Sequence, residues 1–302
     1  MKRVVFFMLL VVFSLIFWSC SQKTNIVEPE DVFTIDMDNF NQFVRPEFID
    51  NRSDAEIEKF TKQASNEYIY RKKKPTNPGG GGSGDDPVDP NPNPANKYAY
   101  IIGISNYEGT QNDLQYCDDD AQDWKSYLQG EGFTIQMDLD LQANANNIQS
   151  GLEWLMNSAS PGDEIAFIYS GHGASYGQNG SCIISSDLYY VTHDFVMEYI
   201  SMANCTKKMV ALDACEIGDF HDNIETGMIV ATASDRSYSY DGESWMQNGV
   251  WTYYYIESLE GGEVFNENAM EFAKSQMKIW GRQVHVRVTP KNTDSYTGMF
   301  DI

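Results

Sequence analysis

The stretch "MVALDACEIGD" (Met209–Asp219) ends an apolar run on an acid, a small residue and a cysteine. Upstream, "DEIAFIYSGHGAS" (Asp163–Ser175) ends a similar run on a histidine between two glycines. Short, nearly continuous apolar runs are typical of strands that are buried on both faces of a parallel sheet. Because the carboxyl ends of parallel strands meet at one edge, we expect the residues after both runs to share a crevice.

Apolar runs alternate with helical patterns from Lys97 onward. Strands are predicted at residues 98–104, 133–139, 164–170, 207–213, 226–234 and 283–290. Helices are predicted at residues 118–133, 144–159, 193–203, 249–262 and 266–281. This alternation predicts an α/β domain over residues 97–302, with a mainly parallel six-stranded sheet flanked by helices.

The chain begins with a targeting segment. In residues 1–20, Lys2 and Arg3 precede an apolar stretch shorter than the ~20 residues of a spanning helix, which predicts a secretory signal peptide. Its end, Ser19-Cys20, is similar to the lipobox of bacterial lipoproteins, and this resemblance implies lipidation of Cys20. An ordinary cleaved signal and an uncleaved anchor are the alternatives.

Two further segments precede the α/β domain. Residues 21–74 are polar and weakly periodic, as expected of a pro or spacer region. Residues 75–96 are rich in glycine and proline with no apolar pattern, which predicts a linker.

The composition narrows the range of partners. A formal net charge of −23 over 302 residues argues against nucleic acid and anionic membrane surfaces and favours basic partners. Beyond Cys20 the chain has four cysteines, with no CxxC pair and no metal-ligand spacing to a histidine: Cys117, Cys182, Cys205 and Cys215.

The two decisive stretches place reactive side chains at strand ends. His172 follows the predicted strand 164–170, and Cys215 follows the predicted strand 207–213. If these strands are neighbours, about 4.8 Å apart, the thiol and the imidazole come within reach of each other. The imidazole can then keep the thiol ionised as a thiolate, or take its proton as it attacks. The backbone N–H groups of Gly173 and Cys215 could then face a developing oxyanion.

At these residues the chain resembles a known group. "YSGHG" followed by "DAC" is similar to the caspase-like cysteine peptidases of clan CD, which include caspases, metacaspases, paracaspases and clostripain-type enzymes. The resemblance extends over Lys97–Ile302, with "YAYIIGISNY" and "LQYCDDDAQDW" similar to metacaspase segments. It implies a caspase-like (caspase-hemoglobinase) fold, with His172 as general base or ion-pair partner and Cys215 as nucleophile.

The resemblance also implies a specificity pocket. Metacaspases have an acid where Asp213 stands, and Asp120 and Ser170 match two further positions of their S1 pocket. An ionised carboxylate at the pocket floor selects a cationic side chain and repels an aspartyl substrate. For Asp120, a favourable charge in the first turn of a helix is the alternative.

Two further expectations depend on charge. Some metacaspases hold calcium through acidic loop residues, and the candidates here are Asp187, Asp219 and Asp222, although carboxylates are abundant throughout the domain. The run "RKKK" beside the linker is a possible self-processing site, with a solvated charge run as the alternative: Arg71, Lys72, Lys73 and Lys74.

Together these features predict an exported cysteine endopeptidase that cleaves after Arg or Lys through an acyl-enzyme on Cys215. We expect peptide or protein substrates, no cofactor unless calcium, and attachment to a bacterial membrane, periplasmic or at the cell surface, through a lipid anchor only. The alternative is a catalytically silent caspase-like domain that binds basic peptides or proteins.

Overall fold

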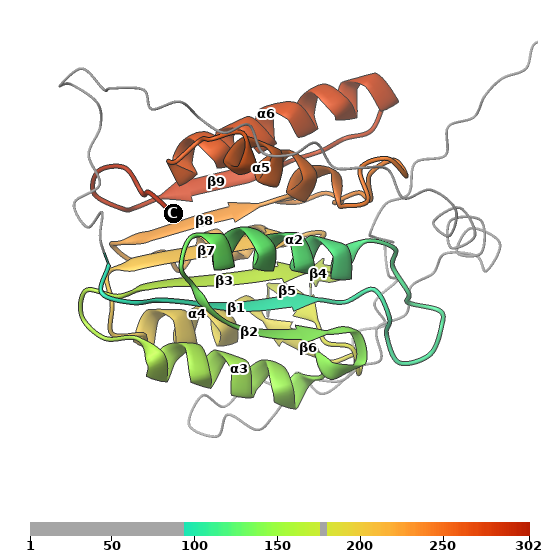
Figure 1. Ribbon diagram of the computed structural model, residues 1–302. Coiled ribbons are helices and arrows are strands. Elements are labelled where there is room, and N and C mark those ends of the chain that lie inside the picture. Colours follow the sequence, from blue (N-terminus) through green and yellow to red (C-terminus); the bar gives the residue numbers. More distant parts are fainter. Residues whose placement is uncertain (1–93, 176–179) are drawn as a thin grey trace, which may run out of the picture.

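The computed structural model describes residues 94–175 and 180–302. Its main sheet has six strands in the order β2-β1-β3-β7-β8-β9 (Figure 1). The strands are β1 (Lys97–Gly103), β2 (Thr134–Leu139), β3 (Glu164–Ser170), β7 (Lys207–Asp213), β8 (Met228–Thr232) and β9 (Lys291–Asp294). All neighbouring pairs are parallel except β8 and β9 at one edge. The mainly parallel six-stranded sheet is therefore confirmed.

Helices cover both faces of this sheet (Figure 1). Side chains alternate along each strand, so that Ala166 and Ile168 of β3 face one layer and Phe167 and Tyr169 the other. The first layer holds α2 (Cys117–Gly130), α5 (Val250–Glu260) and α6 (Asn266–Val284). The second holds α3 (Ala145–Ser158), α4 (His193–Met202) and a small antiparallel sheet of β4 (Gly173–Ser175), β5 (Ser181–Ile184) and β6 (Tyr190–Thr192).

Local signals fix where the helices of the second layer begin. The Asn144 side chain accepts a hydrogen bond from the Asn147 N–H at 3.0 Å ahead of α3. The Thr192 hydroxyl accepts one from the Phe195 N–H at 3.3 Å ahead of α4. Each cap satisfies a backbone donor that has no partner within its own helix.

The predicted strand at 283–290 is wrong. Helix α6 continues to Val284 and ends at His285, whose φ of 60° lets the Val286 N–H donate to the Gly281 carbonyl at 2.9 Å. Val286 and Val288 then pack on the helical layer outside any strand, and pairing with the sheet starts only at Lys291. Alternating apolar residues are satisfied here by packing on one side, without a strand ladder.

A buried charge network lies at the amino edge of the sheet, opposite the ends of β3 and β7 that carry His172 and Cys215. The Lys207 Nζ is 3.2 Å from the Glu164 carboxylate and 3.0 Å from Asp301, and Lys97 lies 3.6 Å from Glu164. Burial raises the pKa of Glu164 to about 7, although Lys207 and Lys97 lower it. The network joins the starts of three strands to the last residues of the chain.

Several predictions fall outside the described residues. These are the signal peptide at 1–20, the region 21–74, most of the linker 75–96, Cys20 and the basic run Arg71–Lys74. Within residues 94–175 and 180–302, no helix combines the length and hydrophobicity that a bilayer crossing requires.

Candidate active site

The strands that end in reactive residues are neighbours. Strands β3 and β7 pair in parallel, and Ser170 at the end of one lies opposite Asp213 at the end of the other. The Gly171 N–H donates to the Asp213 carbonyl at 3.2 Å, so the two chains stay together beyond the strands. His172 and Cys215 each follow two residues after this last pair. The neighbouring strands expected from the sequence are therefore present.

Gly173 makes the approach between these two segments possible. A Cβ atom at Gly173 would lie 2.3 Å from the Cys215 carbonyl oxygen and 2.9 Å from the Cβ of Ala214. Only glycine therefore lets the backbone after His172 pass directly against the backbone of Cys215.

The loop after β1 holds His172 in one orientation. The Nε2 of His172 lies 2.8 Å from the Asn112 carbonyl oxygen, which can only accept a hydrogen bond, so Nε2 carries the proton of the neutral ring and Nδ1 the lone pair. The His172 N–H donates to the Tyr107 hydroxyl at 2.7 Å, and the two rings are in tilted contact with centroids 4.8 Å apart. The Tyr169 hydroxyl donates to the His172 carbonyl at 2.7 Å.

The loop after β8 holds the sulfur of Cys215. The Ser239 N–H donates to Cys215 Sγ at 3.2 Å, a contact that favours the thiolate. The following residue, Glu216, adopts a φ of 54°, and its N–H donates to the Ser234 hydroxyl at 2.8 Å and to the Ser237 carbonyl at 2.9 Å. The turn after Cys215 is thus fixed by the same loop that contacts the sulfur.

Two of the other described cysteines are poor nucleophiles. Cys117, Cys182 and Cys205 are buried and form no disulfide with one another. Burial raises the pKa of Cys205 to about 11 and raises that of Cys182 further. A protonated thiol is a weak nucleophile, so these two residues are suitable controls for Cys215.

The three predicted pocket residues meet beside this pair. The Ser170 hydroxyl donates to Asp120 Oδ2 at 2.7 Å. A Cβ atom built on Gly249 would lie 2.5 Å from Asp213 Oδ2 and 3.0 Å from Asp120 Oδ2, so both carboxyl groups face the same glycine. The position of Asp120, nearly inaccessible at 1% exposure, differs from that of an ordinary exposed first-turn charge.

Neutral donors surround the Asp213 carboxyl group. The Ser239 hydroxyl donates to Oδ1. Thr252 donates to Oδ2 from its hydroxyl at 2.8 Å and from its N–H at 3.2 Å. Ser239 therefore contacts both this acid and the sulfur of Cys215.

Neutral donors also surround Asp120. The Asn248 amide bridges two acids, donating at 2.9 Å to Asp120 Oδ1 and at 2.9 Å to Asp123 Oδ2. The Gly249 N–H adds a hydrogen bond of 3.0 Å to Asp120 Oδ1.

This arrangement raises the pKa of both acids. Burial raises the pKa of Asp213, against the hydrogen bonds from Ser239 and Thr252. Burial raises that of Asp120 well above its usual range, and the charge of Asp213 adds to the shift. Two buried acids with only neutral donors around them would be stabilised by an incoming cation.

Sequence reasoning missed five residues that complete this site. They are Tyr107 and Asn112 around the imidazole, and Ser239, Asn248 and Thr252 around the sulfur and the acids. Asn112 acts through its backbone carbonyl, a group that every residue has, so the sequence does not reveal this role. The other four are single polar or aromatic residues without a motif.

The calcium candidates have partners within the protein. Asp187 accepts hydrogen bonds from the Ser185 hydroxyl at 2.6 Å and the Ala145 N–H at 2.9 Å. Asp222 is exposed near the end of a short 3-10 helix. Within the described parts of the chain, no three His, Cys, Asp or Glu side chains gather as a metal site, and calcium binding stays a prediction.

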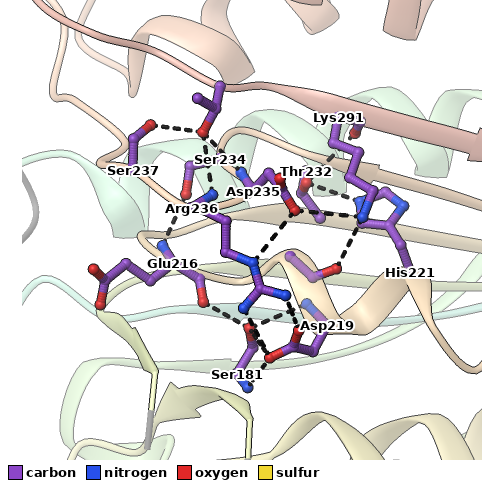
Figure 2. A network of polar contacts seen from close by, with 12 residues as sticks. Ser181, Glu216, Asp219, His221, Thr232, Ser234, Asp235, Arg236, Ser237 and Lys291 are labelled. Atoms are coloured by element: carbon purple, nitrogen blue, oxygen red, sulfur yellow. Dashed lines mark hydrogen bonds and ion pairs between the residues drawn. The ribbon is translucent and has the colours of Figure 1, made fainter.

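The third candidate, Asp219, belongs to an ion-pair network (Figure 2). Burial would raise its pKa, but the hydrogen bonds and charge of Arg236, with help from Ser181, lower it below the usual value. Nearby, Lys291 pairs with Asp235 at 3.3 Å. These contacts brace the loops after β7 and β8, which hold the turn after Cys215.

Comparisons with known proteins agree with this geometry. The family model of the caspase domain matches residues 96–284. Metacaspase-1 of Scheffersomyces stipitis is 34% identical over 89 residues, covering 26% of this chain and 22% of that protein. Metacaspase-4 of Arabidopsis thaliana is 30% identical over 146 residues, covering 42% and 34%. The chain thus spans well under half the length of these two relatives.

A solved structure shares the fold. The crystal structure of protein GSU0716 from Geobacter sulfurreducens aligns with a TM-score of 0.53 at 15% identity, covering 67% of this chain and 94% of that chain. With a family match over most of the described residues and reactive side chains on adjacent strand ends, the chain belongs to the caspase-domain family of cysteine peptidases.

Proposed function

We propose that this protein is a cysteine endopeptidase that cleaves peptide bonds after Arg or Lys. The observation that carries the proposal is the pairing of β3 with β7, because it brings the segments of His172 and Cys215 to one edge of the sheet. The buried acids Asp120 and Asp213 beside that edge support the choice of a basic P1 residue.

The reaction begins with proton transfer from the Cys215 thiol to Nδ1 of His172. The thiolate attacks the carbonyl carbon, forming the S–C bond and an oxyanion. His172 then gives its proton to the leaving nitrogen as the C–N bond breaks, which leaves a thioester on Cys215. Water, deprotonated by His172, attacks the thioester, the S–C bond breaks, and the thiol is restored.

Backbone donors stabilise the oxyanion in this proposal. The Ile184 N–H donates to the His172 carbonyl at 3.1 Å. Because bonded and non-bonded pairs alternate along an antiparallel ladder, the N–H of Gly173 is directed away from β5. With the N–H of Cys215 it forms the predicted oxyanion hole.

The acidic pocket selects the P1 residue. The guanidinium of Arg or the ammonium of Lys supplies the positive charge that Asp120 and Asp213 lack, and Ser170 completes the pocket wall. An aspartyl side chain would bring a third negative charge to the same buried position, and its cleavage is therefore excluded.

Three fluorogenic peptides that differ only in P1 test the proposal. We expect turnover with Arg and Lys and none with Asp, and we expect Cys215→Ala to abolish activity. Cys205→Ala is the matched control, because that buried thiol keeps a raised pKa of about 11 and lies outside the site. Equal turnover of the aspartyl peptide would overturn the pocket assignment.

A silent domain that binds basic peptides is the second candidate, because the buried acids would attract a cation without any chemistry. An arginyl chloromethylketone separates the two, since only an assembled thiol and imidazole alkylate rapidly. A single adduct on Cys215 by mass spectrometry supports the peptidase. Peptide binding without an adduct supports the silent domain.

The remaining proposals concern two matters. One is the segment of the chain that precedes the domain, and the other is calcium. The protein is exported and held to a membrane by a lipid on Cys20, and it cuts itself within Arg71–Lys74. Release of a fragment that begins within or just after this run, absent in Cys215→Ala, would support self-processing. We also propose that calcium binds near one or more of Asp187, Asp219 and Asp222, and activity unchanged by a chelator would argue against it.

A further inference from the structure

A cleft of about 670 Å³ opens at the carboxyl ends of β1 and β2, outside the site described above. The loop after β1 forms one wall, and the end of β2 with the short 3-10 helix η1 (Asp140–Gln142) forms the other. The lining residues that matter most are Tyr107, Asp113, Met137, Leu139, Asp140 and Leu141.

This cleft adjoins the proposed general base. Tyr107 lines it, and the same residue contacts the His172 ring and accepts a hydrogen bond from the His172 N–H. The loop that provides this wall also carries Asn112, which fixes the His172 tautomer. The loop after β1 therefore forms one wall of the cleft and also positions the His172 imidazole.

The walls of the cleft are preformed. Asp140 Oδ1 accepts hydrogen bonds from the N–H groups of Ser105 at 2.9 Å and Asn106 at 2.8 Å, which ties the end of β2 to the loop after β1. Asp113 Oδ1 accepts the Tyr107 N–H at 3.0 Å within that loop. A ligand would find the cleft shaped before binding, with little ordering cost.

The strand order gives the site a direction. Strands β3 and β7 lie between β1 and β2 on one side and β8 on the other (Figure 1). Seen from the His172 and Cys215 segments, Asp213 contacts α5, whereas the cleft lies toward β1 and β2. In the proposed reaction the leaving nitrogen must lie against the imidazole that protonates it. The substrate residues before the bond therefore occupy the Asp213 side, and those after it begin at His172.

We infer that this cleft binds the substrate segment that follows the scissile bond. The inference rests on the proposed peptidase function and assigns that enzyme a second recognition site, beyond the pocket for P1.

The residues that line the cleft indicate which class of peptide segment it would bind. Met137, Leu139 and Leu141 provide an apolar surface, and Leu141 is 61% exposed although it is a large aliphatic side chain. Asp113 and Asp140 add negative charge, and none of the described lining residues is Lys, Arg or His. The cleft therefore favours a segment that combines aliphatic side chains with a positive charge.

Two substrates with the same residues before the scissile bond distinguish recognition of the residues before that bond from recognition of the residues after it. One is an aminocoumarin amide, which has no residue after the cut. The other is a quenched peptide that continues with Leu-Arg-Leu, with the bond after that Arg N-methylated so that it resists cleavage. A Leu-Glu-Leu version tests the charge preference.

Variants are chosen at exposed cleft positions that spare the fold. Leu141→Ala should raise KM for the Leu-Arg-Leu peptide by about threefold to tenfold, because it removes apolar contact area, and should leave the amide unchanged. Gln142→Lys should reverse the preference for the Leu-Arg-Leu over the Leu-Glu-Leu peptide. Met202→Ala is the control, because Met202 is 43% exposed at the end of α4, ahead of the amino end of β7.

The outcomes distinguish the two proposals. A rise in KM for the Leu-Arg-Leu peptide alone supports the assignment of the cleft to the segment after the scissile bond. Equal changes for both substrates, or none with Leu141→Ala, would overturn it while the peptidase assignment stands. If the unaltered protein turns over neither substrate, the peptidase proposal fails and the cleft assignment fails with it.

Discussion

Asp120 and Asp213 come from a helix and from a strand end, and their carboxyl groups both face one glycine, Gly249. Their donors among the described residues are all neutral, so this part of the chain holds a pair of acids with no cationic hydrogen-bond partner. Such a pair is unfavourable for folding when ionised and favourable for binding a cation.

Replacing one acid by its amide should therefore stabilise the protein and impair its activity. Folding raises the pKa of Asp120, so the stability that its protonated form provides at low pH is lost as the pH rises through the folded pKa. Asp120→Asn should raise Tm at pH 8 by about 3–6 °C, or about 1–2 kcal/mol, and the gain should shrink at low pH. Turnover of the Arg substrate should fall at least about 30-fold.

Glu198→Gln, at an exposed position of α4, is the control for this effect, and both its Tm and its activity should stay unchanged. A lower Tm for Asp120→Asn at pH 8 would contradict the argument.

Cation binding should weaken as the pH falls. The pKa values of Asp120 and Asp213 are raised, so the acids take up protons at a higher pH than exposed carboxyl groups do. Calorimetry with benzamidine on Cys215→Ala, from about pH 9 to pH 5, should show a dissociation constant that rises by up to about tenfold per pH unit for one coupled proton. A constant affinity over that range would show that the acids do not hold the cation.

Gly249→Ala should disrupt the acidic pocket. The new Cβ would approach Asp213 Oδ2 to 2.5 Å, which forces a shift that we expect to cost about 1–3 kcal/mol and most of the activity on basic P1 substrates. Gly130→Ala is the matched control at the end of α2, because its Cβ would meet nothing within 4 Å. Urea denaturation and kcat/KM for both variants test the difference, and equal behaviour would refute it.

Two substitutions in the buried charge network at the amino edge of the sheet, Lys207→Met and Glu164→Gln, should have unequal effects on stability. Lys207→Met leaves Glu164 buried without its main cation and should destabilise the protein by about 3–5 kcal/mol at pH 8. The loss should shrink as the pH falls toward the Glu164 pKa of about 7, because removing Lys207 raises that pKa and the variant takes up the proton first.

Glu164→Gln should change the stability by less than about 1 kcal/mol, because Lys207 keeps its contact with Asp301 at 3.0 Å. The free energy of unfolding against pH for both variants is the measurement. Similar losses at pH 8 would mean that the charge pair as a whole stabilises the fold.

The sequence was sufficient to predict the five parallel strands and the strand ends after which His172 and Cys215 lie, but not the edge strand β9. Apolar strands such as Glu164–Ser170 and Lys207–Asp213 match their predicted bounds, because a strand buried on both faces leaves an uninterrupted signal. The small sheet of β4, β5 and β6 was missed, since strands of three or four residues are too short to produce a pattern.

The surroundings of the reactive residues were less predictable. Asn112 contributes a carbonyl group that any residue would provide. Asn248 and Thr252 reach the acids because the chain between β8 and α5 folds back, and no local pattern specifies that path. Predicting such contacts requires the tertiary structure, which brings residues far apart in sequence together.

The ion network at the amino edge also orients the domain. Lys97, where the first strand starts, and Asp301, near the end of the chain, are both linked to it. Anything tethered ahead of the domain therefore leaves from the side remote from Cys215. In the proposed lipid-anchored form, the edge of the sheet that carries His172 and Cys215 would therefore face away from the membrane.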